Sequence, residues 1–112
     1  MVLTIREEIK SPWTILYLSG KLDVLTAEFL EESLSKCFHE GKSDVAINFC
    51  SLSYLSSSGI RVLLLWHKKF YEQNRQILLI ELPFHIAEII SLAGFDKVFK
   101  IAKDFNEVKN SL

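Results

Sequence analysis

The sequence predicts one α/β domain with a mixed, mostly parallel β-sheet, an N-terminal β-hairpin and about four helices. Two apolar stretches near the N-terminus are joined by a short polar link, which favours an antiparallel pair of strands. After them, segments with helical spacing alternate with short apolar runs, and this order implies crossovers between parallel strands. No linker, internal repeat or low-complexity tract interrupts the 112 residues, so we expect a single domain over residues 1–112.

The predicted hairpin occupies the start of the chain. Residues 2–5 alternate between apolar and polar side chains and indicate a short strand, and residues 13–18 indicate a second one. Residues 7–12 form the polar turn between them, with Pro12 outside the hydrogen-bonded ladder. Residues 19–23 are expected to form a loop before the first helix.

The remaining elements follow the change in hydrophobic period. In order, they are a helix from Val24 to about residues 39–41, a strand over 44–49, a helix over 57–74, a strand over 76–82, a helix from Pro83 to Leu92, a strand over 98–101 and a helix over 104–112. Either Asp23 or Thr26 could cap the first helix. Residues 77–80 are apolar on both faces, as expected of a central strand.

Hydroxyl groups are concentrated before the second predicted helix. Five serines occur from Ser51 to Ser58, where we expect a polar loop. Serine caps helices because its hydroxyl accepts from the free backbone N–H groups of the first turn. The same N–H groups favour negative charge, so a phosphate on one of these serines would be tolerated and exposed. On local chemistry alone, a cap and a loop with no further role explain the serines as well.

Composition excludes several classes of protein. With 49% hydrophobic residues the chain should fold, and a net charge of -1 gives no general attraction to nucleic acid or anionic membranes. No apolar run is long enough to span a bilayer, and the N-terminus lacks the order of a signal peptide, so we expect a cytoplasmic protein. Cys37 and Cys50 are too few for a disulfide scaffold or a metal site, and both thiols should be reduced.

Signatures of catalysis are missing from the sequence. The glycines are isolated, so there is no glycine-rich phosphate loop, and the Ser-Ser-Ser-Gly segment lacks the flanking glycines of a nucleophile elbow. The three histidines fall in three different predicted helices, without ligand spacing or an evident acidic partner. We therefore expect no enzymatic activity, no cofactor and no metal.

Residues 54–60, Tyr-Leu-Ser-Ser-Ser-Gly-Ile, followed by Val-Leu-Leu at 62–64, resemble the D-S-[ST]-G-[LI] signature of STAS domains. These are the anti-sigma factor antagonists of bacteria and their relatives. Residues 18–23 are similar to the family's G-x-L-D loop, residues 45–49 stand where its buried L-D-L strand lies, and residues 89–99 resemble its L-x-x-x-G-L-x-x-x-F segment. The resemblance covers nearly the whole chain and implies a small α/β binding module without catalytic activity.

In the antagonist branch of the family, the resemblance implies a phosphorylation switch. An anti-sigma factor serine kinase, a histidine-kinase-like ATPase, would phosphorylate Ser57, the first serine after the signature position of Asp. The unmodified form would bind this kinase and free the sigma factor, the phosphorylated form would not, and a PP2C-type phosphatase would reset it. The implied partner-binding residues are Leu22, Asp23, Ser56, Ser57, Ser58, Gly59, Ile60 and Arg61.

The sequence departs from the signature at three positions. Ser56 replaces the Asp before the phosphorylated serine, Asn48 replaces the strand Asp, and Arg61 stands where the pattern often has Gly. Without the Asp, Ser56 and Ser58 are alternative phosphate acceptors. Arg61, on the first turn of the helix, could reach a phosphate on Ser57 or Ser58, pair with an acid of a partner, or remain a solvated side chain.

Two other functions compete with the antagonist. The chain could be a constitutive STAS adaptor that docks the ATPase subunit of a lipid-transport ABC complex through the serine loop, without phosphorylation. It could instead be an enzyme with a serine nucleophile, which would need a His or Lys within reach of Ser57. Nothing in the sequence places one there, so the adaptor is the stronger alternative.

Overall fold

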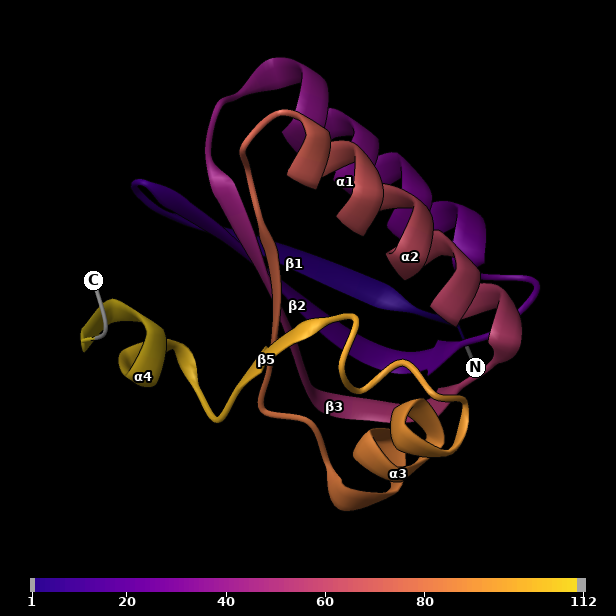
Figure 1. The fold of residues 1–112 in the computed structure, drawn as a ribbon. Helices are drawn as coiled ribbons and strands as arrows, with labels where there is room; N and C mark the ends of the chain where they lie inside the picture. Colours follow the sequence, from indigo (N-terminus) through magenta and orange to yellow (C-terminus); the bar gives the residue numbers. More distant parts are fainter. Residues whose placement is uncertain (1, 111–112) are drawn as a thin grey trace.

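The computed structural model describes residues 2–110, which form one α/β domain around a mixed five-stranded sheet (Figure 1). The strands lie across the sheet in chain order: β1 (Thr4–Lys10), β2 (Trp13–Leu22), β3 (Asp44–Leu55), β4 (Ile77–Ile80) and β5 (Lys100–Ala102). β1 pairs with β2 in the antiparallel direction, and all the other neighbouring strands are parallel. The predicted fold class, with its N-terminal hairpin, is therefore confirmed.

Helices cover both faces of the sheet. They are α1 (Ala27–Glu40), α2 (Ser57–Glu72), α3 (Phe84–Leu92) and α4 (Phe105–Asn110). α1 and α2 lie side by side (Figure 1), and together with α3 they pack on one face of the sheet. The short α4 packs on the opposite face, where its Val108 joins Trp13 and Ile15 of β2. No helix within residues 2–110 is both long and apolar enough to cross a lipid bilayer.

The central strands divide their side chains between two cores. On β3, Val45 and Ile47 join the core under α1, α2 and α3, and Ala46 joins the core under α4. This follows from the alternation of side chains along a strand. All four residues of β4 are buried, so this strand is apolar on both faces, as the sequence predicted.

Several predicted boundaries are wrong, and three of the errors make a strand too short. β1 continues to Lys10 through the expected turn, β2 continues to Leu22 through the expected loop at 19–23, and β3 continues to Leu55 instead of ending at residue 49. The extensions of β2 and β3 pair with each other, through register shifts between Tyr17 and Ser19 and between Gly20 and Lys21. Backbone pairing thus continues through segments whose exposed polar side chains give no hydrophobic pattern of a strand.

The other boundary errors concern a helix and the C-terminal region. α1 begins at Ala27, and not at Val24, because residues 23–26 form a turn. β5 occupies residues 100–102 in place of 98–101, and α4 begins at Phe105. The predicted end of the last helix at residue 112 lies outside the described residues.

Arg75 ties the end of α1 to the start of β3. Its guanidinium donates to the carbonyl oxygens of Cys37 and Phe38 in the last turn of α1, at 3.0 and 2.9 Å. It also donates to the carbonyl oxygen of Ser43, at 2.9 and 3.2 Å, and lies 4.5 Å from the ring centre of Phe70. The last carbonyl groups of α1, which have no partner within the helix, thus accept hydrogen bonds from one planar guanidinium.

Replacing this arginine by lysine tests the anchor. We expect Arg75→Lys to lower the free energy of unfolding by about 2 kcal/mol, because an ammonium cannot supply the planar fork of donors that these carbonyls require. Urea unfolding followed by circular dichroism measures the change. Arg61→Lys is the matched control, since Arg61 is exposed, and it should leave stability within about 0.5 kcal/mol. Equal midpoints for the two variants would contradict the anchor.

Candidate functional site

The turn that carries the signature serines lies where β3 ends and α2 begins. The amide of Ser56 donates to the carbonyl oxygen of Leu22, at 2.9 Å, so the turn is fastened to the carboxyl end of β2. The Ser56 hydroxyl accepts from the amide of Gly59 at 3.3 Å and caps α2. Serine at this position starts the helix as expected, with extended backbone angles that turn the chain out of the sheet.

The serines predicted to form one polar loop take up different positions. Ser51 and Ser53 belong to β3, where the Ser53 hydroxyl donates to the carbonyl oxygen of Gly20 at 2.9 Å, so the predicted loop is wrong for both. Ser56 is half-buried and occupied as the cap, and Ser58 is half-buried. Ser57, the first residue of α2, is exposed. Of the three signature serines it is therefore the most accessible to another protein.

Gly59 sets how closely α2 approaches the sheet. A Cβ atom at this position would lie 2.7 Å from Cγ of Leu22 and 2.9 Å from Cδ1 of Leu55, closer than such atoms can approach. The backbone of the first helical turn therefore rests directly on two buried leucines. Ile60 beside it is buried as well. Three of the predicted partner-binding residues are thus buried and support the exposed serine turn from below. They are Leu22, Gly59 and Ile60.

Asp23 shapes the neighbouring turn, between β2 and α1. Its carboxylate accepts from the amides of Leu25 and Thr26, at 2.9 and 3.1 Å, and the Thr26 hydroxyl donates to the carbonyl oxygen of Lys21 at 2.7 Å. Thr26 occupies the N-cap position of α1 but its side chain makes no capping hydrogen bond to the helix, and both side chains instead bond within the turn. It projects Val24 and Leu25 outward, with 72% and 78% of their surface exposed. The sequence predicts a helix from Val24, with both apolar side chains counted in its hydrophobic pattern, and does not indicate that they are exposed.

A shallow groove lies beside Ser57. It has a volume of about 260 Å³ and runs between the first turns of α2 and the segment after α3. Its lining residues are Ser57, Ile60, Arg61, Leu64, Ala93 and Phe95. Among residues 2–110, Arg61 has no ion pair or side-chain hydrogen-bond partner, and it is exposed. The groove therefore combines an exposed hydroxyl, an unpaired cation and an apolar floor.

Asn48 meets an acidic side chain, which explains one departure from the signature. This buried residue of β3 donates from Nδ2 to Oε2 of Glu81 at 2.9 Å, and its Oδ1 accepts from the amide of Cys50 at 2.8 Å. Glu81 has a φ of 53°, in the left-handed region, which is uncommon for a residue other than glycine. An aspartate at position 48 would place a carboxylate against this glutamate, whereas the amide donates to it.

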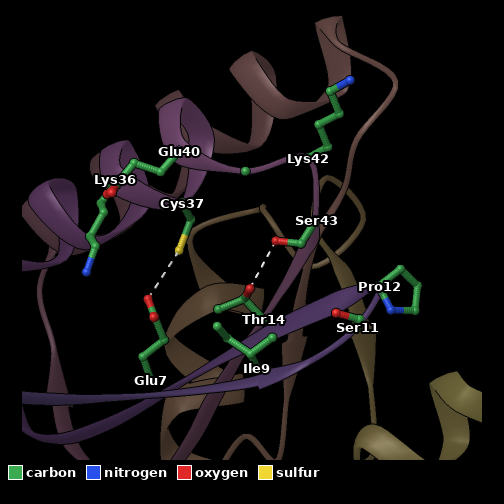
Figure 2. Close-up of a pocket in the computed structure, with 11 residues that line it drawn as sticks. Glu7, Ile9, Ser11, Pro12, Thr14, Lys36, Cys37, Glu40, Lys42 and Ser43 are labelled. Carbon is green, nitrogen blue, oxygen red and sulfur yellow. Dashed lines mark hydrogen bonds between the residues drawn. The ribbon is translucent and has the colours of Figure 1, made fainter.

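A second hollow, of about 520 Å³, lies at the other end of β3, between the hairpin and the end of α1 (Figure 2). Thr14 and Ser43 share a hydrogen bond there at 3.0 Å, and the Cys37 thiol donates to Oε2 of Glu7 at 3.8 Å. Burial, with the Glu7 carboxylate, raises the pKa of Cys37 to about 11. Because the thiol stays protonated at neutral pH, it is a weak nucleophile. Cys37 and Cys50 are both free.

The comparisons with known proteins agree with this geometry. The sequence matches the STAS domain family over residues 1–108. BtrV of Bordetella bronchiseptica, described as a candidate anti-sigma factor antagonist, is 33% identical over 85 residues, which are 76% of this chain and 73% of BtrV.

Solved structures show the same fold. The anti-sigma factor antagonist SpoIIAA in its unphosphorylated form superposes with a TM-score of 0.81 at 17% identity, over 96% of both chains. Its phosphorylated form, from Bacillus, gives a TM-score of 0.73 at 17% identity, over 97% of this chain and all (100%) of that one. A Thermotoga maritima protein, also described as a candidate anti-sigma factor antagonist, gives 0.87 at 15% identity, over 96% of this chain and 92% of its own.

The close contact at Gly59 predicts a cost for any side chain there. We expect Gly59→Ala to lower the free energy of unfolding by about 1–3 kcal/mol, because Leu22 and Leu55 must move to admit a methyl group. Chemical denaturation measures it. The matched control is Gly41→Ala, where the nearest atom to a new Cβ is the carbonyl oxygen of Cys37 at 3.7 Å. That variant should be neutral or slightly more stable, and an equal loss in both would refute the contact.

The pairing of Asn48 with Glu81 predicts a pH-dependent effect. Asn48→Asp should cost about 2 kcal/mol at neutral pH, because a carboxylate on a buried residue would then face the carboxylate of Glu81. Their repulsion raises a carboxyl pKa in the folded state, so the loss should shrink as the pH falls and the pair takes up a proton. Unfolding measured between pH 4 and 8 gives the profile. Adding Glu81→Gln should restore stability at neutral pH, and a pH-independent loss would contradict this account.

Proposed function

Because the chain belongs to the STAS domain family, we propose that it is an anti-sigma factor antagonist switched off by phosphorylation of Ser57. It binds a kinase-like anti-sigma factor through the surface around the serine turn, and so frees a sigma factor. The observation that carries the proposal is the position of Ser57, exposed at the start of α2 beside a groove and an unpaired arginine. The name of its relative BtrV supports the same function.

The surroundings of Ser57 suit a reversible change of charge. A kinase can reach its exposed hydroxyl without unfolding the helix, because Ser56, and not Ser57, provides the cap. A phosphate adds about -1.5 to -2 charges at neutral pH and is tolerated at a helix start. Inside a protein interface the same charge repels an acidic or apolar surface. We therefore expect binding to change while the fold does not.

The proposed docking surface has an exposed layer and a buried support. Ser57 and Arg61 lie on α2, and Val24 and Leu25 lie on the turn after β2. The two regions are held together at the carboxyl ends of β2 and β3, since the amide of Ser56 donates a hydrogen bond to the carbonyl oxygen of Leu22. In this proposal the exposed residues contact the partner. Leu22, Gly59 and Ile60 position them from beneath.

The proposed cycle needs two further proteins. A histidine-kinase-like ATPase is both the anti-sigma factor and the kinase that modifies Ser57. A PP2C-type phosphatase removes the phosphate and restores binding. All three would act in the cytoplasm, and neither nucleic acid nor a membrane takes part in the contact.

A second candidate function is the constitutive adaptor that docks an ABC-transporter ATPase through the same surface. One observation favours it, which is that Ser56 stands in place of an aspartate, so the residue before the acceptor Ser57 carries a hydroxyl and not a carboxylate. A kinase that requires that carboxylate would not modify this chain. The turn would then be a docking surface with a permanent hydroxyl at its centre.

Capture of partners from native cell extract tests the proposal. Wild type, Ser57→Ala and Ser57→Asp are used as bait, and intact-mass analysis of the endogenous protein looks for one phosphate on Ser57. We expect the Ala variant to keep a kinase-like partner and the Asp variant to bind it at least about tenfold more weakly, because a carboxylate enters the interface.

Ser58→Asp serves as the matched control in the same experiment. Ser58 is the half-buried neighbour, so this change adds the same charge one residue away from the exposed position. If it abolishes binding as strongly as Ser57→Asp does, the switch is not specific to Ser57. An unphosphorylated chain bound to a transporter ATPase would replace the antagonist by the adaptor.

A further inference from the structure

We propose that Arg61 is a built-in counter-ion for a phosphate on Ser57. The inference rests on the proposed function only in taking Ser57 as the modified residue. In the unmodified protein the guanidinium is unpaired within the described part of the chain. After modification it would bind the phosphate along the surface of α2, and the charge and the shape of the docking surface would change together.

The helix places the two residues within reach of each other. Ser57 and Arg61 are four residues apart in α2, and side chains at this spacing lie on the same face with Cβ atoms about 5–6 Å apart. Both residues line the groove and both are exposed, so neither must move through the core to meet. A guanidinium can donate two parallel hydrogen bonds to phosphate oxygens, which a single point charge cannot.

No acidic side chain that lines the groove competes for the guanidinium of Arg61. None of the residues that line the groove is acidic, and the first turn of α2 contains no Asp or Glu. The carboxylate of Asp23, on the neighbouring turn after β2, is bonded to the amides of its own turn. After α3, Asp96 and Lys97 follow Phe95 as an exposed pair of opposite charge. A phosphate on Ser57 would thus be the strongest anion on this face.

A second consequence concerns the partner. A guanidinium that is unpaired at the rim of an apolar groove favours a partner surface with an apolar side chain beside a carboxylate. Phosphorylation would then act twice, because it adds repulsion toward that carboxylate and also removes the cation that attracts it. Phosphorylation would then lower the affinity for the partner by more than the phosphate charge alone would.

The test uses full-length protein with phosphoserine placed at position 57 during translation, so that no kinase is needed. Phosphorus NMR follows the second pKa of the phosphate, whose ordinary value is about 6. We expect this pKa to be lower in the wild-type background than in Arg61→Gln by about half a unit, because the cation favours the dianion. At about 1 M salt the difference should shrink.

Lys68→Gln is the matched control, since it removes an exposed positive charge from the same helix, eleven residues (68 minus 57) from the phosphate. At 1.5 Å per residue it lies about 16 Å away, beyond the screening length at physiological salt. The control should therefore keep the wild-type pKa. Equal pKa values in wild type and Arg61→Gln would overturn the counter-ion.

Thermal unfolding gives an independent readout. Phosphorylation should raise the unfolding temperature by more in the wild type than in Arg61→Gln, by about 1–3 °C, because the ion pair forms only in the folded helix. The unmodified Arg61→Gln variant checks that the substitution itself leaves the fold intact. The same temperature change on phosphorylation in both backgrounds would also overturn the proposal.

Failure here and failure of the proposed function give different results. If the pKa difference is found but Ser57 carries no phosphate in cells, Arg61 can pair with a phosphate and the antagonist switch is refuted. If Ser57 is phosphorylated in cells but the second pKa of its phosphate is the same in wild type and Arg61→Gln, the switch remains and the counter-ion is refuted.

Discussion

The direct contact of Gly59 with Leu22 and Leu55 is the constraint on which the candidate site depends. It lets the first turn of α2 rest on the ends of two paired strands without an intervening side chain. The bond from Ser56 to the carbonyl of Leu22 fixes the same junction through the backbone. The positions of Ser57 and Arg61 follow from it, because both lie on a helix whose start cannot shift along the sheet. A rigid support of this kind allows a change of charge at the surface to alter binding and leave the fold unchanged.

The order of the elements could be predicted from the sequence, because burial imposes different periods on helices and strands. The ends of the elements could not. In the second half of β3, only Leu52 and Leu55 are buried, and their exposed neighbours give the segment the composition of a loop. The opposite error occurred at Val24 and Leu25, whose apolar side chains fit a helix pattern although the structure leaves them exposed. Hydropathy alone does not distinguish a buried apolar residue from one on an open surface.

The candidate site was predictable to the extent that it is local in sequence. The serine turn, the cap at Ser56 and the first turn of α2 lie within a few residues of each other, and capping chemistry identifies them. The groove beside Ser57 also requires Ala93 and Phe95, which come from the segment after α3. Nothing in their local pattern connects them with Ser57. Only the tertiary fold, which places the segment after α3 against the first turns of α2, brings these distant residues together.

The three departures from the signature all make the charge of the chain less negative. Two carboxylates are absent, at Asn48 and Ser56, and one guanidinium is present, at Arg61. Each replacement is accommodated locally, since the Asn48 amide donates to Glu81 and the Ser56 hydroxyl keeps the cap. At the two positions close to Ser57 in sequence, 56 and 61, a hydroxyl and a guanidinium leave the Ser57 hydroxyl in a less negative field than the signature residues would create. A phosphate added there meets less repulsion from its own chain. The added charge therefore weakens the complex with the partner and leaves the stability of the fold nearly unchanged.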